Sequence, residues 1–321
     1  MIDNYGRNIE YVRISVTGSC NLNCIYCRPD VTTDCVCPNG DTGMTAKEYG
    51  AVASILGTMG IKKVRITGGE PLLRNDLCEI IKNIARVEGI QEIAMTTNAI
   101  TLANNASKLK SAGLSRVNIS LDSLNPDKFE KITGGGDLSK VLEGINTAIE
   151  VGLLPVKINV VLIKGVNDDE IDSLINFTKD KPVIVRFIEL MPIGKFGEDN
   201  RDKIIPSSSI VEARPWLQEV TTYADSSPAT YYSIDGGQGL VGFISPMSHR
   251  FCNSCNRIRL TCDGKLKPCL GNNYEVDLLD LLRSNSTKLE SVIRETIYNK
   301  PEGHNFNHKF QSSRDMSKIG G

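Results

Sequence analysis

The sequence predicts an α/β fold, in which a partial (β/α)6 barrel of parallel strands is followed by a C-terminal domain. Short β-rich runs alternate with amphipathic stretches as far as about residue 190, a pattern typical of parallel strands joined by helical crossovers. The alternation stops two units short of a closed eightfold barrel. It is followed by a segment rich in Pro, Gly and Ser between residues 192 and 235, which we interpret as loops and a connector.

The expected elements follow one another along the chain. Runs rich in β-branched and apolar residues predict strands at Tyr11–Val16, Lys63–Ile66, Glu92–Thr96, Arg116–Ser120, Val156–Val161 and Val183–Ile188. Helical spacing predicts helices at Thr45–Met59, Asn75–Val87, Leu102–Ser111, Asp137–Val151 and Asp168–Lys179. Beyond the connector we expect strands at Thr230–Ile234 and Leu240–Ile244, a helical stretch at Val276–Tyr298, and a polar end lying loosely on the surface over residues 300–321.

Composition excludes several classes of protein. The chain has 37 basic and 38 acidic residues among 321, so no strongly basic surface indicates nucleic acid or an anionic membrane as a partner. Residues 1–16 carry several charges and lack the apolar region of a signal peptide. The apolar run Ile158–Ile163 is far too short to span a membrane. We therefore expect a cytoplasmic protein that binds neither nucleic acid nor membrane.

The cysteines are the most informative residues. The chain has 10 of them, at positions 20, 24, 27, 35, 37, 78, 252, 255, 262 and 269. All but Cys78 fall in two short windows far apart in the sequence. In a cytoplasmic chain long enough to bury a core, clustered thiols more often hold metal or do redox work than form structural disulfides.

The first window has the spacing Cys-x3-Cys-x2-Cys and directly follows the first predicted strand. Cys20, Cys24 and Cys27 could wrap their sulfurs around one centre, and soft thiolates favour iron–sulfur clusters or zinc. Three ligands leave one coordination position open for a substrate. A zinc knuckle completed by Cys35 or Cys37, or a redox dithiol made by Cys24 and Cys27, are the alternatives.

With Tyr26 just before its third cysteine, this window resembles the signature of the radical S-adenosylmethionine (SAM) superfamily. The resemblance implies a [4Fe–4S] cluster that binds SAM and cleaves it to a 5′-deoxyadenosyl radical. It also implies that Thr67–Pro71, after the second strand, holds the SAM amino group through Gly69. Tyr26, Ser120 and Met191 match other residues of the SAM site. Taken alone, Thr67–Pro71 is an ordinary turn, Ser120 a capping residue and Met191 a packed side chain.

The second window holds Cys252, Cys255, Cys262 and Cys269. Asp263-Gly264 is typical of a hairpin turn that brings Cys269 back towards the other thiols. From the spacing alone, a closed site that uses all four cysteines is as good an interpretation as a three-cysteine site.

The segment Phe251–Leu270 resembles the C-terminal cluster region of the GTP 3′,8-cyclase, or molybdenum cofactor biosynthesis protein A, family. That resemblance, which spans nearly the whole chain, implies that Cys252, Cys255 and Cys269 hold a second [4Fe–4S] cluster facing the substrate. Cys262 has no counterpart among the family's ligands. The resemblance also implies a radical SAM barrel with connector over residues 1–235 and a C-terminal cluster and substrate region over 236–321. The terminal Gly320-Gly321 matches a tail that reaches into the active site and is needed for turnover.

Three departures from the family pattern stand out. Gly18 and Ser19 replace an Asp-Arg pair, and Ala99 stands where a glycine usually follows Thr-Thr-Asn. Cys35 and Cys37 are atypical, and we interpret them as an unliganded surface pair. The sequence assigns no role to Cys78.

Strand alternation gives independent information about the substrate. Arg13, Ser15 and Thr17 share one face of their strand, and Lys157 and Asn159 share a face of another. Such faces should point into the barrel, where charges are costly unless a ligand satisfies them. No P-loop motif is present. The family resemblance aligns the following residues with GTP contacts: Arg13, Arg65, Thr96, Lys157, Arg257, Ile258 and Arg259.

The resemblance thus implies a SAM-dependent lyase that cyclises GTP for molybdenum cofactor biosynthesis. Arg257, Arg259, Gly320 and Gly321 would be its catalytic residues. The implied partners are an electron donor, a downstream cyclic pyranopterin monophosphate synthase and a second copy in a homodimer. A radical SAM peptide-modifying enzyme with an auxiliary cluster is the alternative within enzymes. A zinc-binding interaction module is the alternative of another class.

Overall fold

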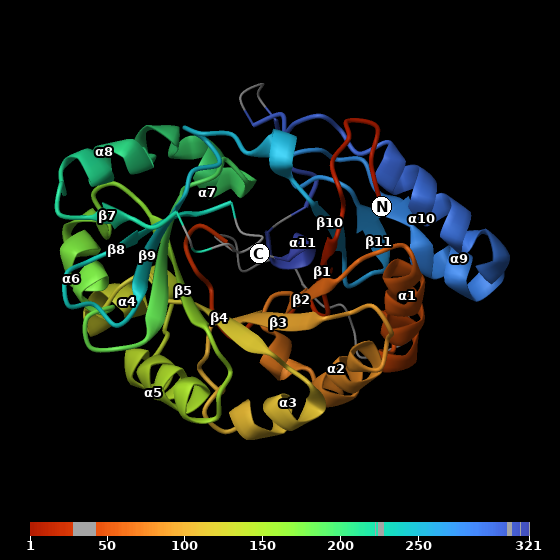
Figure 1. Cartoon of the computed structure of the whole chain (residues 1–321), viewed down its shortest axis with the longest axis horizontal. Coiled ribbons are helices and arrows are strands. Elements are labelled where there is room, and N and C mark those ends of the chain that lie inside the picture. Colours follow the sequence, from red (N-terminus) through yellow and green to blue (C-terminus); the bar gives the residue numbers. More distant parts are fainter. Residues whose placement is uncertain (28–42, 222, 224–227, 307–309, 315, 321) are drawn as a thin grey trace.

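The computed structural model describes residues 1–27, 43–221, 223, 228–306, 310–314 and 316–320. Its strands form one sheet in the order β12-β11-β10-β1-β2-β3-β4-β5-β6-β9-β8-β7. From β10 to β9 all neighbouring strands are parallel, and an antiparallel hairpin extends each edge. The sheet curves into an open arc, with helices α1, α2, α3 and α5 outside it and α11 inside it (Figure 1).

The strands of the barrel lie where the sequence predicts them. Each of the first six begins at the expected residue and ends within one residue of the expected end. The bounds are β1 Tyr11–Ser15, β2 Lys63–Thr67, β3 Glu92–Thr97, β4 Arg116–Ser120, β5 Val156–Leu162, β6 Val183–Glu189, β7 Gln218–Glu219, β8 Thr230–Ser233, β9 Leu240–Ile244, β10 Arg257–Leu260, β11 Lys265–Lys267 and β12 Val276–Asp277.

The helices α1, α4, α5 and α9 each begin after a residue whose side chain caps them. Thr45 accepts a hydrogen bond from the Glu48 amide, and the Glu48 carboxylate accepts one from the Thr45 amide, so α1 starts with a capping box. The bounds are α1 Ala46–Thr58, α2 Leu77–Ala85, α3 Ala106–Ala112, α4 Pro126–Thr133, α5 Leu138–Glu150, α6 Ile171–Asn176, α7 Gly194–Asp199, α8 Ser207–Glu212, α9 Leu278–Ser284, α10 Leu289–Tyr298 and α11 Met316–Ile319.

Three expectations from the sequence were wrong. The interval between β4 and α5 contains an unpredicted helix, α4, which follows the capping Asn125 and ends at a left-handed Gly134. The connector contains α7, α8 and β7 in addition to loops, and Val276–Tyr298 contains β12, α9 and α10 instead of one helical stretch. The C-terminal end is not loose throughout, since Phe306, Phe310 and Ile319 are buried.

The parallel sheet continues beyond the six predicted strands at both edges. The β9 strand pairs with β6, and β10 pairs with β1 at the opposite edge. The sequence predicted the strand Leu240–Ile244, which is β9, but it predicted neither the strand β10 nor the pairing of these two strands with the edges of the barrel. Because one sheet includes strands from both sides of residue 235, the division into segments 1–235 and 236–321 stays a prediction.

One continuous apolar core fills the space between the sheet and its helices. It extends from the barrel strands and α1–α6 to α9 and α10. Burial of this surface provides the main favourable free energy of folding. In the part of the chain that the structure describes, no helix has the length and apolar character needed to cross a membrane.

The turn of the β10–β11 hairpin should tolerate no side chain larger than hydrogen. Gly264 has a φ of +79°, and an added Cβ would collide with Leu279. We expect Gly264→Ala to lower the free energy of unfolding by about 2 kcal/mol or more, through left-handed strain and the collision together. Gly236 also has a positive φ, +68°, but nothing lies near its missing Cβ. Gly236→Ala should therefore lower the free energy of unfolding by only about 1 kcal/mol, measured by urea denaturation. An equal loss of stability in the two variants would contradict the collision with Leu279.

Candidate active site

The first cysteine loop, Val16–Cys27, follows β1 and rests on the loop after β2. The amides of Gly69 and Glu70 donate to the carbonyls of Thr17 and Ser19, at 2.7 and 2.8 Å. An added Cβ on Gly69 would collide with the Ser19 carbonyl oxygen. From the sequence, Gly69 was expected to let a ligand approach the main chain. The structure shows that the missing side chain also lets the backbone of Ser19 approach.

Glu70 joins the loops after β2 and β3. Its buried carboxylate accepts hydrogen bonds from the amides of Asn98 and Leu72 and from the Thr97 hydroxyl, at 2.7, 3.0 and 2.8 Å. Burial raises the pKa of Glu70 to about 7, although these bonds oppose the rise. The Asn98 side chain continues the link to the cysteine loop, because it donates to Asn21 at 2.8 Å.

Tyr26 is fixed from the opposite side of the cysteine loop. Its hydroxyl donates to Asp122, two residues beyond β4, at 2.6 Å, and the same carboxylate accepts the Val161 amide at 2.8 Å. Burial raises the pKa of Asp122 to about 6. The loop that carries the first three cysteines is therefore attached to β2, β3 and β4. Contact of Tyr26 with SAM stays a prediction.

The first three cysteines are free, partly buried thiols. Burial raises the pKa of Cys24, and Asp122, Cys27 and Cys20 add to the rise, so the three sulfurs lie within electrostatic reach of one another. The Cys20 sulfur accepts weak hydrogen bonds from the Leu22 amide at 3.5 Å and from the Asn98 side chain at 3.9 Å. Such donors suit the thiolate ligands of an iron–sulfur cluster, whose potential they adjust.

Cys252, Cys255 and Cys269 are also free, partly buried thiols. Burial raises the pKa of Cys255, but Lys300 and Arg257 lower it below its ordinary value. Burial raises the pKa of Cys269, with Cys255 and Cys252 adding to the rise and Lys300 opposing it. The positive charge of Lys300, which donates to the Pro268 carbonyl at 2.6 Å, would help to balance an anionic cluster.

The remaining cysteines stand apart from these two triads. Cys262 is 2% exposed and disulfide-bonded, so it is not one of the free thiols beside the hairpin. Cys78 is a free thiol packed against the apolar core. Cys35 and Cys37 lie outside the described residues.

The donor atoms of both triads are cysteine thiols. Within the described ranges, no three His, Cys, Asp or Glu side chains form the compact group that one ion requires. A [4Fe–4S] cluster distributes its thiolates over separate irons and so accepts wider spacing. The soft thiolate donors of each triad are compatible with an iron–sulfur cluster.

Four cationic residues form a row across neighbouring strands. The register places Lys267 of β11 beside Arg259 of β10, Arg259 beside Arg13 of β1, and Arg13 beside Arg65 of β2. Burial and the neighbouring charge of Arg13 lower the pKa of Arg259 to about 9. Burial also lowers the pKa of Arg65 and of Lys267. We call these four residues the cationic row.

Several donor atoms of the cationic row have no hydrogen-bond partner within the described part of the chain. Arg13 Nε, Arg65 Nε and Lys267 Nζ are buried and have no hydrogen-bond partner among the residues with described positions. Tyr11 lies among the arginines, with its ring 5.3 to 6.0 Å from the guanidinium carbons of Arg65, Arg13 and Arg257. Buried cations without partners are costly, so the row fits an anionic ligand such as a polyphosphate.

A second row of polar side chains lies on the next strands. Thr96 of β3, Asn118 of β4 and Lys157 of β5 are lateral neighbours. Lys157 is 2% exposed, and its Nζ lies 5.6 Å from the ring centroid of Tyr223 and 5.8 Å from that of Tyr231. The Thr96 hydroxyl is buried and has no hydrogen-bond partner in the described chain.

The structure adds residues that sequence reasoning missed. Lys267, Asn118 and Tyr11 belong to these rows but were not predicted as site residues. The alternation of Lys265, Leu266 and Lys267 was visible, yet only the hairpin register places Lys267 beside Arg259. Ile258, predicted at the GTP site, is buried in the apolar core between Arg257 and Arg259, and its contact with GTP stays a prediction.

The end of the chain reaches the cationic row. Arg259 donates a hydrogen bond to the Gly320 carbonyl, and the Gly320 amide donates to Met316 at 2.9 Å. Gly320 has a φ of +85°, and an added Cβ would lie 2.5 Å from the Thr67 side chain. Only glycine therefore fits this position without displacement. Gly321 lies outside the described residues.

The other predicted SAM residues border the same end of the barrel. Ser120 is the last residue of β4, and Met191 follows β6 and packs against the apolar cluster of Ile193 and Phe306. Ala99, which departs from the family pattern, has a φ of +64°. The glycine usual at that position would adopt this left-handed backbone without strain, which explains the family preference.

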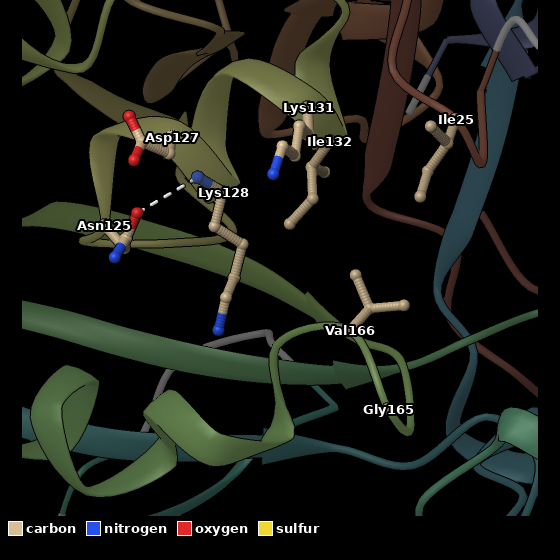
Figure 2. A pocket seen from close by; sticks show the side chains of 8 residues that line it. All are labelled: Ile25, Asn125, Asp127, Lys128, Lys131, Ile132, Gly165 and Val166. Carbon is tan, nitrogen blue, oxygen red and sulfur yellow. Dashed lines mark hydrogen bonds between the residues drawn. The ribbon is translucent and has the colours of Figure 1, made fainter.

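A cavity of about 450 Å³ lies beside the first cysteine loop. Figure 2 shows Ile25 of that loop on one side, Lys128 and Lys131 of α4 on another, and Val166 of the loop after β5 below. Lys128 pairs with Asp169 and Glu170, so its charge is already compensated. The cavity is separate from the cationic row and holds none of the predicted site residues.

The described chain thus contains two groups of three free cysteines and a row of cationic side chains on four adjacent strands. The Radical SAM superfamily matches residues 14–178, and the Molybdenum Cofactor Synthesis C family matches residues 183–306. The solved structure of Streptococcus suis SuiB bound to S-adenosylmethionine aligns with a TM-score of 0.59 over 95% of this chain and 77% of that chain. At 16% identity this likeness concerns the fold. The class is thus a radical SAM enzyme.

Curated relatives define the family within that class. The GTP 3′,8-cyclase of Alkaliphilus oremlandii (strain OhILAs) is 51% identical over 325 residues and covers 100% of both chains. That of Peptoclostridium acidaminophilum is 47% identical over 322 residues and covers 100% of this chain and 98% of its own. The chain belongs to the GTP 3′,8-cyclase family.

The buried Glu70 should make stability depend on pH. Its pKa of about 7 in the folded protein exceeds the ordinary value of 4.5, so the folded state binds the proton more tightly than the unfolded chain. The free energy of unfolding should therefore fall as the pH rises from about 4.5 through about 7, by up to about 3 kcal/mol from this residue. Glu70→Gln removes this contribution and should flatten the profile.

Urea unfolding of metal-free, reduced protein at a series of pH values measures the effect. The control is Glu290→Gln, which removes an exposed carboxylate paired with Arg294 on α10. It should keep the wild-type profile. A Glu70→Gln profile as steep as that of the wild type would contradict the raised pKa.

Proposed function

We propose that this protein is a GTP 3′,8-cyclase that acts in molybdenum cofactor biosynthesis. The reaction removes the ribose 3′-hydrogen of GTP, joins C3′ to guanine C8, and adds one electron and one proton to the resulting base radical, which gives (8S)-3′,8-cyclo-7,8-dihydroguanosine 5′-triphosphate. The observation that carries the proposal is 51% identity to a GTP 3′,8-cyclase over the full length of both chains. The buried cationic row supports it independently, because its unpartnered donors suit a triphosphate.

Membership of the radical SAM superfamily implies a [4Fe–4S] cluster and SAM. In our proposal, Cys20, Cys24 and Cys27 hold that cluster, and Gly69, Tyr26, Ser120 and Met191 line the SAM site. When bound, the cluster and SAM supply an electron and a 5′-deoxyadenosyl radical. Cys252, Cys255 and Cys269 would hold a second [4Fe–4S] cluster next to the substrate, and their state as free thiols supports this assignment.

The remaining site residues bind and orient GTP. Arg13, Arg65, Arg259 and Lys157 would bind the triphosphate as buried donors, with Arg257 beside them over Tyr11. The Thr96 hydroxyl, buried without a described partner, is available to the nucleotide. A bound triphosphate would compensate these buried positive charges. Binding of GTP should therefore relieve the electrostatic repulsion among them. Gly320 and Gly321 would contribute the chain end to the same site.

Several further features belong to the proposal. The enzyme would take its electron from a separate donor and pass its product to cyclic pyranopterin monophosphate synthase. It would work in the cytoplasm as a homodimer, with the barrel and connector in residues 1–235 and the substrate region in 236–321. The peptide-modifying alternative shares its fold with SuiB, which has been solved with its precursor peptide SuiA, at 16% identity. Full-length identity to cyclases favours GTP.

The proposal predicts GTP-dependent cleavage of SAM. Protein reconstituted anaerobically with iron and sulfide, and given SAM and reductant, should form 5′-deoxyadenosine and cyclised product when GTP is added. Arg259→Met should lower the rate at least about tenfold, since it removes a buried phosphate donor. Arg214→Met, which removes an arginine paired with the exposed Asp172, is the matched control and should keep the rate. Fully loaded protein without GTP-dependent 5′-deoxyadenosine would reject the assignment.

Removal of the last two residues tests the tail. Deletion of Gly320 and Gly321 eliminates the carbonyl that accepts the Arg259 hydrogen bond. We expect product formation to be lost while the absorption and electron paramagnetic resonance spectra of both clusters remain those of the full chain. A truncated protein with full activity would contradict a role for the tail.

A further inference from the structure

The chain end lies among buried charges, yet little local structure holds it there. The α11 helix is only four residues long, Met316–Ile319, and such a short helix is not stable by itself. Its residues Ser317 and Ile319 are nevertheless buried, and Gly320 meets Arg259. Contacts with the rest of the molecule must therefore fix the position of this segment.

Arg314, just before α11, makes a double fork with two carboxylates. Its Nε and Nη2 donate to the two oxygens of Glu275 at 2.9 and 2.7 Å. Its Nη1 and Nη2 donate to the two oxygens of Asp263 at 3.2 and 2.9 Å. The Arg314 side chain is 15% exposed. Isolated surface ion pairs contribute little, but bidentate geometry in a partly buried network is the exception.

Both carboxylates belong to the segment that provides two of the four residues of the cationic row, Arg259 and Lys267. Asp263 is in the turn between β10, which carries Arg259, and β11, which carries Lys267. Glu275 immediately precedes β12, the partner of β11. The fork therefore ties the tail to the same hairpin whose Arg259 binds the Gly320 carbonyl.

Asn273 holds the residues before the fork. Its side-chain amide donates to the Gln311 carbonyl at 3.0 Å, and its oxygen accepts from the Ser313 amide and hydroxyl at 3.0 and 3.1 Å. Beyond the fork, Met316 packs against the apolar cluster of Ile193, Phe306 and Phe310. The charged fork fixes direction and register, whereas the apolar contact alone would allow the segment to slide.

We propose that Arg314 is the positioning residue of the C-terminal tail, which it clamps to the β10–β11 hairpin so that Gly320 meets Arg259. Arg314 acts through the tail and is not itself a catalytic residue. The part of this inference that concerns turnover rests on the proposed function, whereas the clamp rests on the contacts of Arg314 alone.

Hydrogen exchange of the tail tests the clamp without any substrate. In cluster-loaded Arg314→Gln, peptides that cover residues 311–320 should exchange at least tenfold faster than in the wild type. Peptides from β1–β6 should be unchanged, because the core does not include the clamp. Arg314→Lys should give an intermediate rate, since an ammonium cannot fork to both carboxylates. The control is Arg294→Gln, which breaks an exposed pair with Glu290 on α10 and should change neither set.

Turnover gives the second measurement. Arg314→Gln should lower the kcat for GTP at least tenfold and change its KM less than twofold, with the spectra of both clusters unchanged. Wild-type exchange rates in the tail, or equally increased exchange throughout the barrel, would overturn the clamp. A loosened tail with wild-type kcat would overturn its role in the reaction. If the wild type itself does not cyclise GTP, the proposed function fails, and the exchange result still decides the clamp.

Discussion

The burial of like charges side by side is the constraint on which the architecture of this protein depends. Lys267, Arg259, Arg13 and Arg65 occupy neighbouring positions on four adjacent strands. Two unit charges one strand spacing apart repel by about 3 kcal/mol at an effective dielectric constant of about 20. The favourable free energy of burying the continuous apolar core must offset this repulsion while no anion is bound. Because the empty site carries this electrostatic repulsion and a bound anion would remove it, the site favours a highly charged anionic ligand.

The same constraint explains why the chain end lies inside the barrel. A main-chain carbonyl is a neutral acceptor, so Gly320 satisfies one donor of Arg259 without occupying the place of an anion. Glycine is required because Thr67 leaves no room for a side chain. The hairpin that carries Arg259 also provides Asp263 at its turn. The β10–β11 hairpin thus positions both the tail and two residues of the cationic row, Arg259 and Lys267.

Buried carboxylates organise the other half of the site. Glu70 connects the loops after β2 and β3, and Asp122 connects the cysteine loop to β5 through Tyr26 and the Val161 amide. Each carboxylate accepts hydrogen bonds from main-chain or hydroxyl donors, which lowers the cost of burial without removing it, so both have raised pKa values. The remaining free-energy cost of burying these carboxylates accompanies the fixed position of the loop that carries the first three cysteines.

The sequence by itself determined the local features. Alternation of apolar residues located six strands to within a residue, the cysteine spacing defined the first triad, and Asp263-Gly264 marked the hairpin turn. In the second window the spacing left three- and four-cysteine sites equally good, and only the family resemblance selected three. Only the tertiary structure decided the features that depend on contacts between distant segments. It pairs β9 and β10 with opposite edges of the barrel and places Lys267 beside Arg259. It also places Arg314 between two carboxylates. Periodicity reports which face of a strand is buried, whereas strand register and chain reversal bring together residues that share no local pattern.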